Sequence, residues 1–259
     1  MIEIPYSIAG FLVGTIVGLT GVGGGSLMTP LLVLGFGISP VTAVGTDLLN
    51  AGFTKIGGAA SHAAKGHVDW RVTGLLASGS VPGALLGLLA LYLLPRAGAS
   101  TQVLVATSLG VMLVLTALSL AFRARLLSWA HSHTGRGWLA RHQTAATVAM
   151  GAFIGLAVTL SSVGAGAIGV TALVLLFPAL ATTRIVGTDI AHAVPITLLA
   201  GFGHALFGNV NWWLLASLLV GSLPGIILGS HLTARIPERV LRFSLVAVLL
   251  FAGTKLLLG

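Results

Sequence analysis

The sequence predicts an all-α, polytopic membrane protein made of two homologous repeats. The first observation is composition: of the 259 residues, 56% are hydrophobic and only 7% are charged, whereas soluble domains carry about 25% charged residues. The second is a series of apolar segments of helix length along the whole chain. The third is that the two halves align with each other. Composition also excludes a disordered chain, because disorder needs low hydrophobicity and high charge.

The rarer residue types narrow the class further. Cysteine is absent, which excludes a disulfide framework, Cys-ligated zinc and iron–sulfur clusters. The formal charge is +8, but the basic residues lie in short gaps between apolar stretches and not on one broad face. We therefore expect anchors of cytoplasmic loops and contact with a lipid bilayer, and no nucleic-acid partner. The N-terminus has no basic n-region or cleavage site, so the first apolar segment is expected to be retained.

Ten apolar segments are expected to be helices. They run over residues 6–20, 26–37, 41–64, 72–94, 101–122, 144–160, 164–177, 183–207, 211–232 and 240–258. A spanning helix needs roughly 20 residues, so the first pair in each half is either two short spans or a re-entrant hairpin. The expected division is a first repeat over 1–122, a basic cytoplasmic loop over 123–143 and a second repeat over 144–259.

Local signals support several of these helices. Ser39 followed by Pro40 is typical of a helix start, with Ser as N-cap and Pro in the first turn. Trp70 and Trp212 start the fourth apolar segment of each half and are typical of anchors at the membrane interface. The motif Gly-Ser-x-Pro-Gly in that segment, at 79–83 and 221–225, indicates a kinked, tightly packed helix or a hinge.

The two halves are copies of one unit. A shift of 142 residues overlays Val44–Gly87 on Val186–Gly229 without a gap, with 17 identities in 44 positions. Upstream, Val22–Gly25 matches Val163–Gly166. Chance matching of Leu and Ala does not align the rarer residues, which here coincide at Asp47/Asp189, His62/His204, Trp70/Trp212 and Pro82/Pro224.

The positions of the basic residues predict that the repeats are inverted. If each repeat has a glycine-broken pair of short helices and three spanning helices, and the 123–143 loop is cytoplasmic, only Arg96 and Lys255 fall outside. Four passes per repeat would put many more basic residues outside, against the positive-inside rule. The basic residues that the first arrangement places inside, besides those of the loop, are Lys65, Arg71, Arg184, Arg235, Arg239 and Arg242. Both termini are then expected outside the cytoplasm.

A glycine run interrupts each broken pair. Consecutive glycines cost roughly 1 kcal/mol each in a helix relative to alanine, and a broken backbone in lipid needs partners from protein, water or ligand. Symmetric interruptions point to a transport site, where amides and a helix N-terminus attract an anion. A tight turn or close helix packing is the alternative. The substrate-binding candidates here are Gly23, Gly24, Gly25, Ser26, Gly164 and Gly166.

Two acidic residues occupy matching positions in predicted membrane helices. Asp47 lies about two turns into its helix, and Asp189 occupies the same place in the second copy. A charge at this depth costs several kcal/mol unless it is paired, hydrated or protonated. They are candidates for proton coupling or gating, with different proton affinities as one option. The alternative is that each accepts hydrogen bonds that lock a broken helix. The preceding Thr46 and Thr188 are candidate substrate ligands.

Three further polar residues share these helices. Lys55 lies eight residues after Asp47 and is a candidate for neutralising the anion or pairing with Asp47; the alternative is a snorkelling lysine. His192 lies one turn beyond Asp189, and its counterpart is Asn50. Both are candidate ligands or relay groups, with interhelical hydrogen bonding as the alternative.

Histidines outside this group are expected to have structural roles. His62 and His204, near helix ends, are assigned an interfacial or capping role. The loop histidines lack acidic partners, so we expect no metal site and no cofactor; they are His131, His133 and His142.

These residues carry a family resemblance. The run GLTGVGGGSLMTPLLVLGFGISPVTAVGTDLL, with KGHVDWR and GSVPGALLG, resembles the sulfite exporter TauE/SafE family, also called the 4-toluene sulfonate uptake permease family. The second half is similar to the family's second module through VGTDIAHAVP and GNVNWWLLASLLVGSLPGIILG. The resemblance covers nearly the whole chain except the 123–143 loop.

The resemblance implies a bacterial inner-membrane permease for sulfite, sulfonates or related small organic or sulfur-containing anions, in either direction. The family motifs fall on the glycine run at 23–25 and on Thr46 and Thr188. Many members have Ser after Gly-Thr, where this chain has Asp47 and Asp189. An ionised Asp would repel an anion, so the resemblance leaves the substrate and the coupling open.

The expected function is secondary transport of a small anion by alternating access, coupled to protons through one Asp. The anion is expected near the midplane, between the glycine breaks and the helices that carry Asp47 and Asp189. One alternative is an anion channel or a non-transporting membrane subunit. Another is an intramembrane enzyme using Ser161-Ser162 and His192, although no matching catalytic motif is present and no enzyme activity is expected. The sequence leaves a homodimer open.

Overall fold

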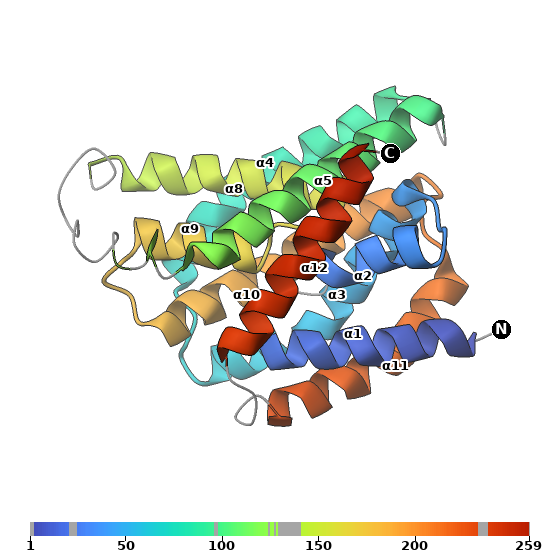
Figure 1. Cartoon of the computed structure of the whole chain (residues 1–259). Coiled ribbons are helices and arrows are strands. Elements are labelled where there is room, and N and C mark those ends of the chain that lie inside the picture. Colours follow the sequence, from blue (N-terminus) through green and yellow to red (C-terminus); the bar gives the residue numbers. More distant parts are fainter. Residues whose placement is uncertain are drawn as a thin grey trace.

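The computed structural model describes residues 3–20, 25–95, 98–123, 125–126, 128, 141–232 and 238–258. All regular secondary structure in these ranges is helical (Figure 1). The predicted all-α class is therefore confirmed. Most of the predicted 123–143 loop lies outside the described residues, including His131 and His133.

The helices follow the ten predicted apolar segments closely. Their bounds are α1 (Ile4–Thr20), α2 (Gly25–Pro30) continued by the π-helical turn η1 (Leu31–Gly35), α3 (Pro40–Ala64), α4 (Trp70–Leu93), α5 (Ala99–Ala121), α8 (Gln143–Ser161), α9 (Ala167–Leu176), α10 (Thr182–Leu206), α11 (Trp212–Leu232) and α12 (Glu238–Leu258). Each bound lies within about three residues of its predicted one, because the apolar runs end where loop residues begin.

The helices differ in how far they reach across a bilayer. Six in the described ranges are long and apolar enough to cross it: α4, α5, α8, α10, α11 and the 240–258 part of α12. The helix α3 has 25 residues but carries several polar groups. The ten residues of α9 rise only about 15 Å, half of a hydrocarbon core of about 30 Å. The described part of the chain therefore has six candidate spans and several shorter apolar helices.

The two repeats interlock. The closest pairs are α1 with α11 and α4 with α8, and each pair takes one helix from each half. Figure 1 shows α4 and α8 together on one side of the molecule and α1 and α11 on the opposite side. The equivalent helices α3 and α10 pack on each other between them, as do α5 and α12. Neither half encloses its own core.

Small residues let these pairs approach at backbone distance. A Cβ atom on Gly14 would lie 2.6 Å from the carbonyl oxygen of Ser222, and one on Gly79 would lie 1.9 Å from that of Val148. Close approach through small residues is typical of membrane helix pairs. The tight packing predicted for the Gly-Ser-x-Pro-Gly segments is therefore confirmed, with Pro82 inside α4 and Pro224 inside α11.

The equivalent helices α3 and α10 run in opposite directions. Their glycine contacts show this, because the residue numbers on α3 increase while those of the contacted residues on α10 decrease. A Cβ on Gly45 would meet His204, one on Gly52 would meet Leu198, and one on Gly58 would meet Ile190.

A short loop of the same design ends both α3 and α10. Gly66 and Gly208 adopt positive φ angles of 68° and 76°, which favour glycine because other residues clash there. Asp69 then caps α4 by accepting a hydrogen bond from Val72 N (3.2 Å). Asn211 lies at the matching position of the second repeat and accepts from Leu214 N (3.0 Å).

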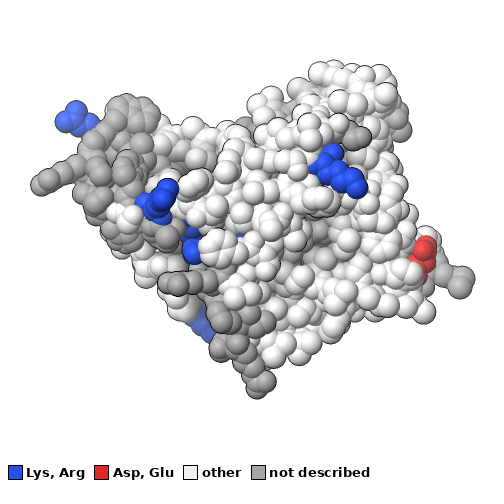
Figure 2. Space-filling view, in the orientation of Figure 1, with Lys and Arg blue, Asp and Glu red and all other residues white. Residues whose placement is uncertain are grey.

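Basic residues gather at one end of the molecule. Figure 2 shows most of the visible Lys and Arg at the end where α8 begins. The described basic residues at or just beyond helix ends, Lys255 aside, are Lys65, Arg71, Arg123, Arg125, Arg141, Arg184 and Arg242. Arg96 and Arg235 lie outside the described residues.

Candidate functional site

The second glycine run interrupts the helical backbone. In the second repeat α8 ends at Ser161, Ser162 takes a left-handed conformation (φ 60°), and Gly164 and Gly166 have φ angles of 132° and 125° before α9 begins. Glycine is required at such angles because a Cβ atom would clash. In the first repeat α1 ends at Thr20 and α2 begins at Gly25. The predicted Gly23 and Gly24 lie outside the described residues.

The start of α2 meets the break of the second repeat inside the protein. A Cβ on Gly25 would lie 1.8 Å from the carbonyl oxygen of Ser162, so the start of α2 packs directly on the break of the other repeat. Ser26 follows and is buried at 5% exposure. Gly25 and Ser26 therefore lie at the centre, where sequence analysis placed the substrate, although nothing described here tests their contact with it.

Asp47 is completely buried and surrounded by donors. Its Oδ2 accepts hydrogen bonds from Thr29 Oγ1 (2.6 Å) and Ser162 Oγ (3.0 Å), while Asn50 Nδ2 donates to Oδ1 (3.4 Å). Thr29 belongs to α2 and Ser162 to the break after α8. The carboxylate of Asp47 therefore joins three separate chain segments.

Asp189 is equally buried but has fewer partners. It is 2% exposed and lies at the start of α9, where the Gly166 amide is hydrogen-bonded to its carboxylate. A Cβ on Gly169 would lie 2.0 Å from Asp189 Oδ1. This Oδ1 has no hydrogen-bond partner in the described part of the chain. Buried polar atoms are usually paired, so an additional donor is expected at this atom.

The different partners follow from the sequence of the two breaks. When Val22–Gly25 is aligned on Val163–Gly166, Thr29 corresponds to Val170 and Ser162 corresponds to Gly21. Both hydroxyl groups that hold Asp47 are thus absent from the corresponding positions beside Asp189.

Asn50 and His192 make equivalent contacts. Ser222 Oγ donates to Asn50 Oδ1 (2.9 Å), and Ser80 Oγ lies 2.7 Å from His192 Nε2. The two serines are the matching residues of α11 and α4. The interhelical hydrogen bonding considered for this pair is therefore present, and a role in substrate binding stays a prediction.

Lys55 connects the two acids electrostatically. It is half-buried on α3, and its charge acts on both Asp47 and Asp189. The corresponding Thr197 instead donates to the Ala193 carbonyl (2.8 Å). The central positive charge is therefore a property of the first repeat alone.

Thr46 and Thr188 hold the loops of the opposite repeat. Thr46 Oγ1 accepts from Asn211 N (3.1 Å), and Thr188 Oγ1 accepts from Asp69 N (2.9 Å). Thr188 also donates to the Arg184 carbonyl (2.7 Å). These hydroxyls have a clear structural use, and their proposed contact with substrate stays a prediction.

The histidines near the helix ends have unequal surroundings. His204 is buried, and its Nε2 donates to the Thr159 carbonyl (2.9 Å). Its counterpart His62 is half-buried, with its ring 5.7 Å from that of His67. Their carbonyls accept from His67 N and Asn209 N, both at 2.9 Å, so each closes its helix end.

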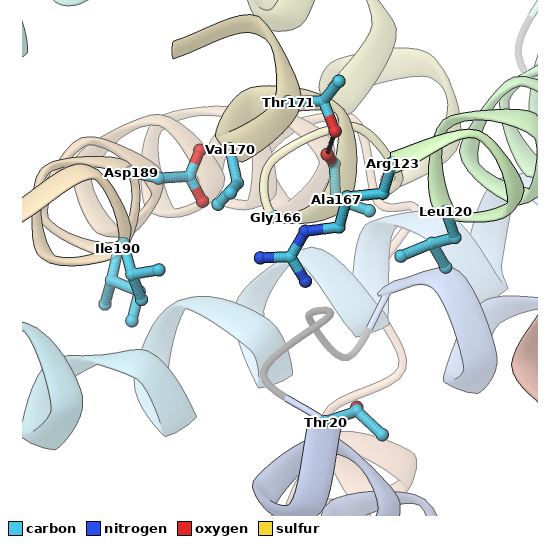
Figure 3. Close-up of a pocket in the computed structure, with 10 residues that line it drawn as sticks. Thr20, Leu120, Arg123, Gly166, Ala167, Val170, Thr171, Asp189 and Ile190 are labelled. Atoms are coloured by element: carbon cyan, nitrogen blue, oxygen red, sulfur yellow. Dashed lines mark hydrogen bonds between the residues drawn. The ribbon is translucent and has the colours of Figure 1, made fainter. Parts of the chain in front are cut away.

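A cavity of about 110 Å³ opens beside Asp189 (Figure 3). We call it the α9 vestibule. Helices α1, α5, α9 and α10 contribute to it, and its lining consists of Thr20, Leu120, Arg123, Gly166, Ala167, Val170, Thr171, Val186, Asp189 and Ile190.

Arg123 is the vestibule residue that sequence reasoning missed. Its guanidinium extends into the space between Asp189, Leu120 and Thr20 (Figure 3). The sequence marked it only as the first basic residue of a cytoplasmic loop. Its position at the end of α5 was visible, but the packing of α5 beside the second break was not.

The family model for the sulfite exporter TauE/SafE matches residues 6–256. A probable membrane transporter protein of Bacillus subtilis (strain 168), YjnA, is 39% identical over 255 residues, which cover 98% of this chain and all of the relative. A second from the same strain, YdhB, is 29% identical over 248 residues, covering 95% and 97%.

A probable membrane transporter protein of Xylella fastidiosa (strain Temecula1 / ATCC 700964) is 28% identical over 235 residues, covering 88% and 84%. No solved structure matches the chain.

Proposed function

The chain belongs to the sulfite exporter TauE/SafE family and is a multi-pass membrane transporter; from this premise we propose that it is a secondary transporter of a small anion. The substrate class is sulfite, a sulfonate or a related sulfur-containing or organic anion. The membrane is the bacterial inner membrane, with the basic end of the molecule in the cytoplasm.

One observation carries this proposal: helix α9 begins at a backbone break inside the folded protein, and its N-terminus points at the buried Asp189. Half-helix ends of this kind hold anionic groups in membrane transporters. The start of α2 packs on the break that precedes α9, so the starts of both short helices belong to one central region.

The transporter is proposed to consist of inverted repeats. The opposite courses of α3 and α10 support this, since equivalent helices related by an axis in the membrane plane run antiparallel. The pairing of α1 with α11 and of α8 with α4 supports a two-fold relation between the repeats, because one rotation exchanges these pairs. The short broken segment of each repeat would then enter the membrane from a single side. Both termini would lie outside the cytoplasm.

The transporter is proposed to be a carrier with proton coupling. Buried carboxylates change charge by taking up a proton, and two of them lie in this central region. The small size of the α9 vestibule and the sealed surroundings of Asp47 favour a carrier over an open channel.

The chain is proposed to have no enzymatic activity. Ser161 Oγ donates to the Ala157 carbonyl (2.6 Å) and Ser162 Oγ to Asp47. The serine that His192 does contact, Ser80, is 1% exposed. A nucleophile needs a base and access to substrate, which these contacts do not favour.

Counterflow in proteoliposomes tests the proposal. Vesicles are loaded with unlabelled sulfite, and entry of ³⁵S-sulfite is followed with an internal pH dye. A carrier gives labelled uptake that internal sulfite accelerates and a pH change that accompanies it. Passive flux without acceleration would instead favour the channel. Absence of flux for sulfite, thiosulfate, methanesulfonate and small carboxylates would overturn the proposal.

A further inference from the structure

We propose that the Asp189 carboxylate is an internal substitute for the transported anion. When ionised it occupies the N-terminus of α9; when protonated it leaves this place to a small oxoanion, which Arg123 holds from the other side of the α9 vestibule. The inference rests on the proposed function and deepens it, because it assigns the anion site, the proton site and their competition to named residues.

The first step is that the start of α9 attracts one negative charge. The amides of Gly169 and Val170 already donate to the carbonyls of Gly164 and Gly166 (3.1 and 2.8 Å). The amides earlier in this first turn have no carbonyl partner within the helix. Among them, the Gly166 amide is hydrogen-bonded to Asp189. A helix start with these amides and its positive dipole end suits a carboxylate or an oxoanion equally.

The second step is an unsatisfied atom at this place. Asp189 Oδ1 is buried and has no hydrogen-bond partner among the described residues, and the residue itself lines the vestibule. A proton on the carboxyl group turns it from an acceptor into a donor for a bound anion. The same proton removes the charge that would repel the anion.

The third step is the positive charge across the cavity. Arg123 lines the vestibule together with Asp189, and its guanidinium extends into the space (Figure 3). A guanidinium presents a planar set of donors that suits oxoanions. Arg123 and the start of α9 thus approach the same space from two sides.

The fourth step is size. The vestibule volume is about 110 Å³, which accommodates several waters or one small ion. Sites for drug-sized ligands are roughly 300–1,000 Å³. The vestibule therefore selects a small oxoanion such as sulfite or methanesulfonate and excludes an aromatic sulfonate.

The fifth step concerns the charges that set the pH dependence. Arg123, two residues after the end of α5, lines the vestibule together with Asp189, and the charge of Lys55 on α3 acts on Asp189. His192, one turn further along α10, has its Nε2 at Ser80. Among the described lining residues, α1 contributes Thr20 and α9 contributes apolar residues, glycine and Thr171. An ionised carboxylate and an oxoanion exclude each other at contact distance, so each monovalent anion binds together with one proton.

Binding of methanesulfonate to the purified full chain in detergent tests this inference, because this anion keeps its charge over the accessible pH range. Sulfite is the second probe. For the wild-type chain we expect affinity to fall about tenfold per pH unit above the pKa of the Asp189 carboxyl. In Asp189→Asn, which carries no charge at any pH, affinity should change less than about threefold over the same range.

Two matched variants test the partners. Arg123→Gln should weaken binding about tenfold or more at every pH, whereas Arg125→Gln should not, since Arg125 lies over the Phe122 ring and does not line the vestibule. Asp47→Asn should keep the wild-type pH dependence. Monodisperse elution and helical circular dichroism identify variants that fold.

The absence of native cysteine provides a readout that needs no known substrate. Thr20→Cys places a thiol in the vestibule lining, and its modification rates by an anionic and a cationic methanethiosulfonate reagent are compared. The ratio of anionic to cationic rate should fall as pH rises, and should stay constant when Asp189→Asn is added.

The inference is overturned if Asp189→Asn retains the pH dependence of binding, or if Arg123→Gln and Arg125→Gln bind equally well. It is also overturned if the wild-type chain binds neither probe and the rate ratio at Thr20→Cys is independent of pH. Counterflow of sulfite alongside any of these results would leave the proposed function intact and reject only this assignment.

Discussion

Asp47 and Asp189 stand at equivalent positions in two copies of one helix, and their side chains meet different neighbours. Asp47 accepts hydrogen bonds from two hydroxyls and an amide. Asp189 faces a helix start, with one oxygen unpartnered in the described structure. The repeat gives both acids the same backbone, and a few side chains in the two breaks give them different chemistry.

Access to the two acids differs in the same sense. Val186, Asp189 and Ile190 on α10 line the α9 vestibule, whereas their counterparts Val44, Asp47 and Leu48 on α3 are all 0% exposed. The packing around them also differs, because α8 contacts α10 while α1 is barely in contact with α3. The second repeat therefore has a cavity beside its acid, whereas the corresponding residues of the first repeat are fully buried.

The largest expected effect is the difference in stability between a variant that lacks the Asp47 carboxylate and one that lacks the Asp189 carboxylate. Asp47→Ala leaves three donors without an acceptor, and each buried unpaired donor costs about 1–3 kcal/mol, so a loss of about 3 kcal/mol or more is expected. Asp189→Ala removes fewer contacts and should cost about 1 kcal/mol. Thermal unfolding in detergent measures both. Equal shifts in melting temperature would remove the distinction between the two acids.

The rate of cysteine modification tests whether the surroundings of Asp189 are more accessible than those of Asp47. Val186→Cys and Val44→Cys make the same small change at equivalent positions, in a chain without native cysteine. A water-soluble maleimide should modify Val186→Cys at least about tenfold faster than Val44→Cys. A buried thiol reacts only after the surrounding structure opens locally, and an opening free energy of about 1.4 kcal/mol slows the reaction tenfold. Similar rates would mean that the two halves are equally accessible.

The smallest expected effect is the loss of a hydrogen bond that both halves make between a threonine and a loop amide. Thr46→Val and Thr188→Val each remove one hydrogen bond to a loop amide of the opposite repeat. Each should cost about 1 kcal/mol, and the two costs should add, since the sites are separate. Chemical or thermal unfolding of the single and double variants provides the comparison. Unequal costs would show that the symmetry of these loops does not extend to their energetics.

The sequence predicted what depends on order along the chain. Apolar runs gave the helices, and the matching of Val44–Gly87 to Val186–Gly229 gave the equivalence of Asp47 with Asp189. The glycine runs predicted the interruptions, and the one described in full places Gly164 and Gly166 at φ angles that other residues avoid.

What the sequence did not predict depends on contacts between distant segments. Ser162 reaches Asp47 across 115 positions, and Arg123 lines the same cavity as Asp189 because α5 packs beside α9. The hydroxyls of the Gly-Thr motif hold the loops at Asp69 and Asn211, contacts that the sequence did not predict, and their contact with substrate stays a prediction. Such pairings are set by how the repeats interlock, and no local pattern encodes them.

Transport driven by a pH gradient tests most directly whether Asp189 alone carries the proton. Proteoliposomes with wild type, Asp47→Asn or Asp189→Asn are given equal sulfite on both sides and a pH step across the membrane. We predict that wild type and Asp47→Asn accumulate sulfite on one side, while Asp189→Asn still exchanges labelled for unlabelled sulfite but accumulates none. Accumulation by Asp189→Asn equal to that of the wild type would contradict this account.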